Sequence, residues 1–206
     1  MFKNYNESVF PAQIIFNLMA LLGILLLFKR QKNNDKIISA ILSFLWLWIG
    51  IVYHLLFFSK INTAAYGFGI LFIIQGIIFF YFGVLKDQLS FTYRKDIYSF
   101  IGFIFLLYAL IIYPILGHIS GHQYPYSPTF GLPCPTTIYT FGFLMFLKNK
   151  ISIKILIIPF LWSLLGFSAA VQLSVYEDFG LLIAGILASS LLIIRNKKIS
   201  TSQQPV

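Results

Sequence analysis

The sequence predicts an all-α membrane protein, a polytopic bundle of seven transmembrane helices that forms a single domain over residues 1–206. Composition is the first observation behind this prediction. Of the 206 residues, 59% are hydrophobic and only 10% are charged, whereas soluble domains carry about 25% charged residues. The second observation is that the apolar residues form uninterrupted runs of membrane-spanning length. A lipid bilayer is therefore the partner expected for most of the surface.

Short charged or proline-rich segments separate the apolar runs. A transmembrane helix needs about 20 predominantly apolar residues, and most of the runs reach this length. Pro159 lies inside the sixth run, so we expect a kink there and a backbone carbonyl that a neighbouring helix must satisfy. The predicted spans are 9–28, 37–58, 61–85, 97–117, 135–147, 155–173 and 176–194.

The basic residues predict the orientation of the bundle. Lys and Arg cluster in alternate loops, and all of the 15 except Lys3 and Lys60 fall on one side. Because cytoplasmic loops carry an excess of Lys and Arg, we expect the N-terminus outside and the C-terminus in the cytoplasm. This arrangement requires an odd number of spans. The net charge of +9 does not favour a nucleic-acid partner, because the charges lie in short clusters between apolar runs.

The fifth span is too short to cross a bilayer as one regular helix. Between Pro135 and Lys148 the chain can form about 20 Å of helix, whereas the hydrocarbon core measures ~30 Å. The preceding segment, HQYPYSPTFGLPCP, contains four prolines and cannot be a regular helix. Irregular backbone at membrane depth is tolerated where it is buried in protein or lines a wet cavity. We therefore expect residues 118–134 to form an outer loop that dips into the bundle before a short helix at Pro135.

The start of this short helix is a candidate site. Pro135 suits the first helical position, which makes Cys134 the expected N-cap and puts Thr136 in the first turn. Free backbone N–H groups at a helix start favour an anion or a thiolate. Cys134 is therefore expected to ionise easily and to react or bind a ligand. Its alternative role is that of a small buried residue that packs a tight loop.

The predicted topology collects most of the other reactive side chains on the outer side. His54 lies within the second span, where an ionisable side chain is a functional candidate. Its alternative role is a hydrogen bond to a backbone carbonyl. Glu177 and Asp178 precede the last span, where their alternative role is to cap its helix. The candidate ligand-binding residues are Asn6, His54, His122, Cys134, Thr136, Glu177 and Asp178.

These residues are expected to form one cluster, although the sequence cannot show which of them touch. We expect His54 or His122 to lie within about 8 Å of Cys134 or Glu177, roughly the reach of two side chains or one bridging water. Histidine, cysteine and carboxylate side chains also suit a transition metal as cofactor, but their spacing matches no metal motif such as HExxH. The metal candidates are His54, His118, His122, Cys134 and Glu177.

Five stretches spread over almost the whole chain carry a resemblance: YNESVFPAQ, VYHLLFF, YPILGH, YPYSPTFGLPCPTTIYTFG and SVYEDFGLL. With them the chain resembles an uncharacterised bacterial integral-membrane family, domain of unknown function 6064 (DUF6064). The resemblance implies a multi-pass protein of the bacterial inner membrane, and it implies no activity, substrate or cofactor. By the resemblance, the motif positions are Asn6, Pro11, Gln13, His54, His122, Pro133, Cys134, Pro135, Glu177 and Asp178.

Three functions remain open from the sequence. The leading hypothesis is a membrane protein that binds or passes a small solute or ion at an outward-facing polar pocket closed by residues 118–134, since transporters build such sites from broken helices. The first alternative is a metal-dependent, membrane-embedded hydrolase or oxidoreductase, so whether the protein is an enzyme stays open. The second is a structural subunit of a membrane complex, with small residues such as Gly185 and Ser189 at the contact.

The charge distribution makes the topology testable. A reporter that is active only in the cytoplasm should be active when it is fused at Val206 and silent when it is fused after Gln123, because the two positions lie on opposite sides of the predicted bundle. Equal activity at both positions, or the reverse pattern, would contradict the seven-span topology.

Overall fold

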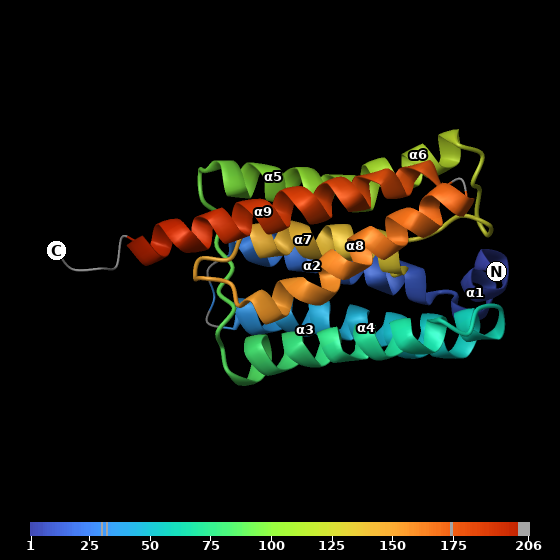
Figure 1. Ribbon diagram of the computed structural model, residues 1–206, viewed down its shortest axis with the longest axis horizontal. Coiled ribbons are helices and arrows are strands. Elements are labelled where there is room, and N and C mark those ends of the chain that lie inside the picture. The colour runs from blue at the N-terminus through green and yellow to red at the C-terminus, as the bar shows by residue number, and fades with distance from the viewer. Residues whose placement is uncertain (30, 32, 174, 202–206) are drawn as a thin grey trace.

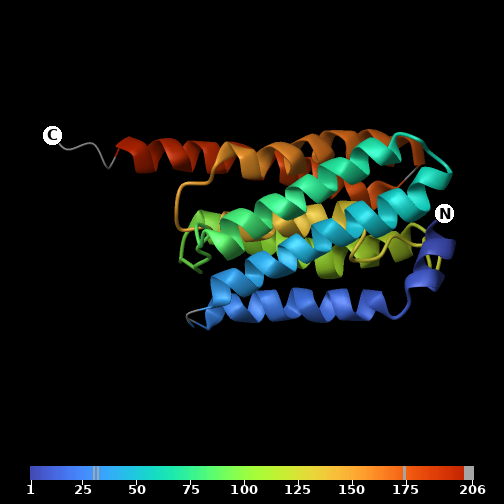
Figure 2. The same cartoon turned by 90° about the horizontal axis from the view of Figure 1, so that it is seen from below.

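The computed structural model describes residues 1–29, 31, 33–173 and 175–201. Within these residues the chain forms helices and no strand beyond two isolated β-bridges. The predicted all-α fold is therefore confirmed for the described part of the chain. The helices run lengthwise along one elongated bundle (Figure 1), and Figure 2 shows the same arrangement from a second side.

Helices cover each of the seven apolar segments. Three segments contain a π-helical stretch, η1, η3 or η4. The elements are α1 (Phe2–Val9), α2 (Ala12–Phe28), α3 (Asn34–Trp48), η1 (Ile49–Phe57), η2 (Phe58–Lys60), α4 (Ala65–Phe79), η3 (Phe80–Leu85), α5 (Ile97–Leu107), η4 (Tyr108–Ile112), α6 (Tyr113–Ile119), α7 (Pro133–Met145), α8 (Ile153–Leu173), η5 (Tyr176–Asp178) and α9 (Phe179–Thr201).

Five helical segments of the described chain are long and apolar enough to cross a membrane. A sixth is obtained if α1 and α2, which are bent by 79° relative to each other, count as one broken span. With 13 residues, α7 is shorter than these segments, so a seventh span stays a prediction. The five segments are Asn34–Lys60, Ala65–Leu85, Ile97–Ile119, Ile153–Val171 and Tyr176–Ser200.

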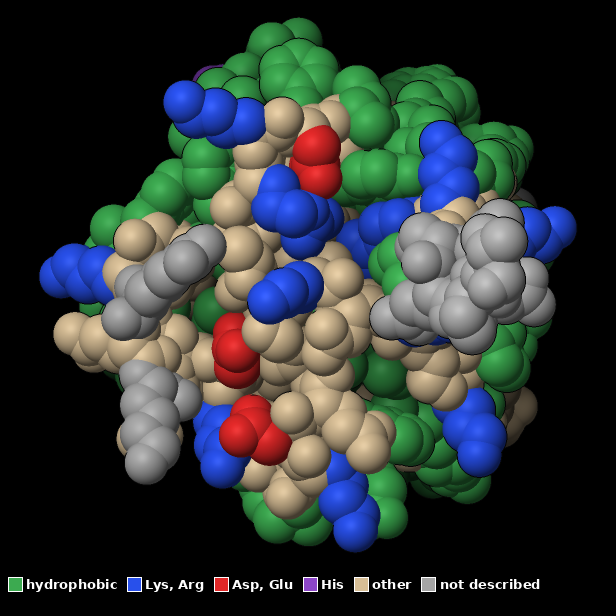
Figure 3. Space-filling model, turned by 90° about the vertical axis from the view of Figure 1, so that its left-hand side faces the viewer, with side chains coloured by type: hydrophobic (Ala, Val, Ile, Leu, Met, Phe, Trp, Pro, Cys, Tyr) green, Lys and Arg blue, Asp and Glu red, His purple; other side chains and the backbone are tan. Residues whose placement is uncertain are grey.

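The exterior has the surface pattern expected for a membrane bundle. Large apolar side chains remain exposed along the helices, such as Leu18 on α2, Ile77 on α4 and Ile183 on α9. Figure 3 shows Lys and Arg side chains spread over the end of the bundle that holds the C-terminus. Water disfavours such extensive exposed apolar surface, whereas lipid accepts it. The fold is therefore compatible with a multi-pass membrane protein.

The short helix α7 lies at the centre of the bundle. All its residues are buried except Cys134, and it packs against α3, α5, α8 and α9. Gly142 of α7 approaches Gly102 of α5 so closely that a Cβ on either glycine would lie 3.0–3.1 Å from the carbonyl oxygen of the other. Small residues allow such close approach of helix backbones. The position of α7 therefore depends on the absence of side chains at this crossing.

Two arginines satisfy the C-terminal end of α7, where the last carbonyls have no partner within the helix. Arg94 donates to the carbonyl oxygens of Met145, Phe146 and Leu147 at 3.1–3.2 Å. Arg195, from α9, also donates to the Met145 carbonyl at 3.4 Å. The positive charges are favourable at this end of the helix dipole as well.

Asp96 holds Arg94 in position. The Nε of Arg94 donates to Oδ2 of Asp96 at 2.7 Å, and the backbone N–H of Ser99 donates to Oδ1 at 2.8 Å. Burial by itself would raise the pKa of Asp96, but the hydrogen bonds from Ser99 and Arg94 outweigh it and lower this pKa below its ordinary value. Asp96 is therefore ionised at neutral pH and keeps Arg94 aimed at α7.

Gln75 completes the backbone hydrogen bonding of α8. Pro159 lies inside α8 and has no N–H, so the carbonyl of Ile155 lacks its usual partner. The side-chain amide of Gln75, from α4, donates to this carbonyl at 3.2 Å. The expectation that a neighbouring helix satisfies the carbonyl released by Pro159 is therefore confirmed.

Replacing Gln75 tests this contact. Gln75→Leu should lower the free energy of unfolding by about 1 kcal/mol, because it leaves a buried carbonyl without a donor. The loss should shrink in the Pro159→Ala background, where the restored N–H bonds the same carbonyl. Thermal unfolding of the wild type, both single variants and the double variant in detergent measures this coupling. Equal losses in the two backgrounds would mean that Gln75 acts through packing alone.

Candidate functional site

A cavity of about 500 Å³ lies at the end of the bundle opposite the C-terminus, where α1 and the α8–α9 turn meet (Figure 1). We call it the Asp178 cavity. Most of its wall is apolar or aromatic, and a few polar side chains interrupt it. It is lined by Met1, Phe2, Tyr53, His54, Phe58, Ile61, Asn62, Tyr113, Pro128, Leu132, Pro133, Cys134, Pro135, Trp162, Gly166, Ala169, Ala170, Val175 and Asp178.

Asp178 is the charged residue of this cavity. It lies at the end of η5 and is only 7% exposed. The hydroxyl of Tyr113 donates to its Oδ1 at 2.5 Å, and Cys134 lies beside its carboxyl group. Burial opposes ionisation of this carboxyl group, whereas the bond from Tyr113 favours the carboxylate. In the part of the chain that the structure describes, no basic side chain forms an ion pair with Asp178.

Cys134 lies in the first turn of α7 and is not its N-cap. The helix begins at Pro133, within two residues of the predicted start, and Leu132 is the N-cap. Pro133 and Pro135 have no N–H, and the N–H of Thr136 already bonds the carbonyl of Leu132 at 3.2 Å. Only Cys134 is left to offer a free N–H in this turn. The prediction of an anion site built from several N–H groups is therefore wrong.

The thiol of Cys134 faces a carboxylate. It lies close enough to Asp178 for the two groups to interact electrostatically, and Cys134 is half-buried. Gly166 on α8 lies near the thiol, since a Cβ at this position would be in ordinary contact with Sγ at 3.6 Å. The negative charge of Asp178 opposes a thiolate beside it. The expectation that Cys134 ionises easily is therefore wrong.

His54 is fully buried, and neither of its ring nitrogens has a hydrogen-bond partner. The alternative of a bond to a backbone carbonyl is therefore wrong. His54 lies in the π-helical η1, and such segments often occur at functional sites. His54 belongs to the wall of the cavity, and both of its nitrogens are buried there without a partner. Its neighbours are the rings of Phe72, Tyr53, Trp162, Phe68 and Phe58, with centroids 4.9–6.0 Å away.

His122 and Glu177 form a pair beside the cavity. The Nδ1 of His122 lies 2.8 Å from Oε1 of Glu177, so the expected approach of a histidine to Cys134 or Glu177 is confirmed. Glu177 is fully buried, and its Oε2 has no partner. Gly117 makes room for this carboxylate, because a Cβ there would lie 3.0 Å from Oε1. Glu177 therefore has a basic partner, whereas its neighbour Asp178 has none in the described chain.

Asn6 fastens the proline-rich loop to α1. Its Nδ2 donates to the carbonyl oxygens of Pro125 and Ser127 at 2.8 and 2.9 Å. Its Oδ1 accepts from the hydroxyl of Thr129 at 3.2 Å. Since both ends of the amide are engaged, the structure favours a clamping role for Asn6 over a ligand-binding role.

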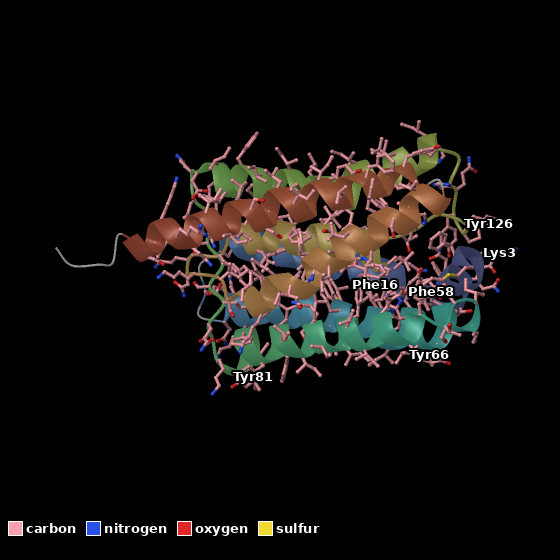
Figure 4. The ribbon with its side chains drawn as sticks, viewed as in Figure 1. Lys3, Phe16, Phe58, Tyr66, Tyr81 and Tyr126 are labelled. Atoms are coloured by element: carbon pink, nitrogen blue, oxygen red, sulfur yellow. The ribbon has the colours of Figure 1, made fainter. Side chains whose placement is uncertain are left out.

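The helix that carries Asn6 was not predicted, because residues 2–9 are too polar to belong to an apolar run. A second contact joins α1 to the same loop. Lys3 places its Nζ 5.5 Å from the ring centroid of Tyr126, and Figure 4 shows the two side chains together at this end of the bundle. The polar N-terminal residues therefore serve to hold the loop against the cavity.

Thr136 and His118 are candidates that do not line the cavity. Thr136 is buried inside α7, with an unpartnered hydroxyl, and His118 is exposed on α6. Among the described residues, no group of three or more His, Cys, Asp and Glu side chains could hold a metal ion. The predicted metal candidates His54, His118, His122, Cys134 and Glu177 are thus not gathered into such a group.

Sequence reasoning missed the aromatic and hydroxyl side chains of the site. Tyr53, Tyr113 and Trp162 line the cavity, and none of them is among the predicted site residues. One signal pointed to Tyr113, which opens the stretch YPILGH, and another to Tyr53, which precedes His54 in VYHLLFF.

Alkylation of Cys134 tests its contact with Asp178. Asp178→Asn should accelerate reaction with N-ethylmaleimide about fivefold or more, since like charges ~4 Å apart repel by at least about 1 kcal/mol even in water. Glu177→Gln is the matched control, because Glu177 bonds His122 and does not line the cavity. Mass spectrometry of the single cysteine measures both rates. An unchanged rate in Asp178→Asn would mean that the carboxylate does not control the thiol.

Comparison with known proteins gives a match to a family profile. Residues 1–203 match the profile of a family described as "Family of unknown function (DUF6064)", while neither the curated proteins nor the solved structures give a significant match. Of the motif positions implied by the sequence resemblance, His54, Pro133, Cys134, Pro135 and Asp178 all line the Asp178 cavity. Since the match covers nearly the whole chain, the protein belongs to the DUF6064 family.

Proposed function

We propose that the protein is a multi-pass protein of the cell membrane that binds a small solute in the Asp178 cavity. The observation that carries the proposal is the combination of a lone carboxylate and an unpartnered histidine in one wall. Asp178 and His54 are 7% and 0% exposed, and both line the cavity. Buried polar groups without partners are costly. A bound solute would supply a hydrogen-bond partner for His54 and a counter-charge for Asp178.

The dimensions of the cavity support this proposal. Sites for small molecules enclose roughly 300–1,000 Å³, with mostly apolar walls and a few polar groups that fix orientation. At about 500 Å³, the Asp178 cavity has this size and this composition. The aromatic rings supply contact area, while Tyr113, Cys134 and His54 supply hydrogen-bonding groups.

The positive-inside rule supports an outward-facing cavity. The cavity lies at the end of the bundle opposite the C-terminus and opposite the basic surface of Figure 3. If that basic surface is cytoplasmic, solutes reach the cavity from outside. In this topology α7 and the segment 118–132 together form the fifth of seven passes, because α7 alone provides only about 20 Å of helix.

Binding fits the structure better than free passage. Beyond the cavity, residues Thr136 to Met145 of α7 are all buried and fill the centre of the bundle. A solute could pass only if α7 moved away from α5, and the Gly102–Gly142 approach and the arginine contacts at Met145 oppose that movement. The proposal is therefore a solute-binding membrane protein, with transport requiring a displacement of α7.

The structural-subunit alternative loses its sequence support. Gly185 faces α8 within the same chain, since a Cβ there would lie 2.0 Å from the hydroxyl oxygen of Ser163. Ser189 is 7% exposed. Both small residues thus serve packing between helices of the bundle, and neither is free to form the contact that this alternative requires.

Protection of Cys134 tests solute binding. A panel of small cationic, neutral and anionic solutes should contain members that slow N-ethylmaleimide labelling of the purified protein, because an occupied cavity shields the thiol. Ala169→Trp should abolish protection by filling the cavity, since Ala169 lines it and is exposed enough to accept a larger side chain. Ser168→Trp, at an exposed position outside the lining, should retain it. If no solute of any charge class protects Cys134, the proposed function is wrong.

A further inference from the structure

We propose that the solute is a protonated organic amine, an inference that rests on the proposed function and names its ligand chemistry. Three features of the Asp178 cavity point to it: an unpaired carboxylate, aromatic walls and an unpartnered imidazole. Among the residues that the structure describes, the cavity lining contains no Lys or Arg. An anionic ligand would therefore meet the charge of Asp178 with no basic side chain to offset it.

The charge balance around Asp178 calls for a cation. Four other carboxylates have basic partners, in the pairs Lys3–Glu7, Lys36–Asp87, Arg94–Asp96 and His122–Glu177. Asp178 is more buried than three of these, yet the hydrogen bond that it accepts in the described chain comes from the neutral hydroxyl of Tyr113. A buried carboxylate is costly unless a positive charge accompanies it. A cationic ligand would provide that charge, and its attraction to the carboxylate of Asp178 would not be weakened by a basic side chain of the protein.

The aromatic walls suit the same ligand. The rings of Trp162, Tyr53 and Phe58 all line the cavity, and Trp162 packs at 5.4 Å from the ring of His54. The faces of Trp, Tyr and Phe attract ammonium groups, most strongly where water is excluded. The rings also accept the apolar body of an organic amine, which a hydrated inorganic cation lacks.

His54 selects an ammonium group that still carries hydrogen atoms. A neutral imidazole offers one acceptor nitrogen, and both nitrogens of His54 lack a partner. With Asp178, it gives the cavity two acceptors for N–H donors, which a protonated amine has and a quaternary ammonium lacks. A bare metal ion is a poorer fit, because no group of three ligating side chains exists among the described residues.

Four probes of similar shape test the inference. They are 2-phenylethylamine, its trimethylammonium analogue, 2-phenylethanol and 3-phenylpropionate, each titrated against N-ethylmaleimide labelling of Cys134 in the purified full-length protein. The amine should protect at concentrations at least about tenfold lower than the alcohol or the carboxylate, a difference of about 1.4 kcal/mol. The trimethylammonium analogue should protect less well than the amine.

Two variants identify the group responsible. Asp178→Asn should reduce the preference for the amine over the alcohol to less than about twofold, since the amide has no charge. Glu177→Gln should retain the preference, because Glu177 lies outside the lining. If Asp178→Asn does not fold, the wild type decides. A cationic methanethiosulfonate should modify Cys134 faster than an anionic one, each rate being divided by that reagent's rate with 2-mercaptoethanol.

The outcomes separate the two proposals. Protection by the alcohol or the carboxylate at least equal to that by the amine, or faster modification by the anionic reagent, would overturn the amine inference and leave solute binding intact. A trimethylammonium analogue that protects as well as the amine would overturn the role of His54 and the need for N–H donors. If no probe and no solute of the wider panel protects Cys134, both proposals fail.

Discussion

A helix of 13 residues at the centre of an apolar bundle creates the constraint on which the rest of this structure depends. At about 1.5 Å per residue, α7 ends well within the length of its neighbours, so the polar groups at both its ends must be satisfied inside the bundle. At one end, Arg94 and Arg195 supply donors for the last carbonyls. At the other, Pro133 and Pro135 remove two of the N–H groups that would need acceptors. At one end of α7 the free carbonyls thus gain donors, whereas at the other end there are fewer N–H groups to satisfy.

The cavity follows from the same constraint. Figure 1 shows α7 beginning short of the ends reached by α6 and α8. The space between the start of α7 and this end of the bundle is partly filled by the proline-rich loop, which Asn6 ties to α1. What remains unfilled is the Asp178 cavity, whose floor is the turn Pro133–Pro135. A full-length helix in the place of α7 would leave no such space, so the cavity depends on the shortness of this helix.

The sequence predicted the helices and the effects of the prolines, which depend on the length and hydropathy of each segment. It did not predict the contacts that depend on the direction of individual side chains. The apolar runs located the helices, and Pro159 correctly implied a neighbouring donor, which is Gln75. The PCP motif offers two prolines for the first helical position, and nothing local distinguishes Pro133 from Pro135. The approach of Cys134 to Asp178 arises from the packing of α7 against α8 and α9, which no single segment encodes.

The different fates of Glu177 and Asp178 argue that the cavity is more than a packing defect. The two acids are consecutive in η5, and either could favour the start of α9 by its charge alone. Glu177 is paired with His122, in a space that Gly117 keeps open. Asp178 lies instead beside Tyr113, which donates a hydrogen bond to it, and beside Cys134, and neither brings a positive charge. The bond from Tyr113 orients the carboxylate and lowers the cost of its burial without neutralising it. A ligand-binding site needs that combination of an oriented and unneutralised charge, whereas a structural role needs only the pairing that Glu177 already has.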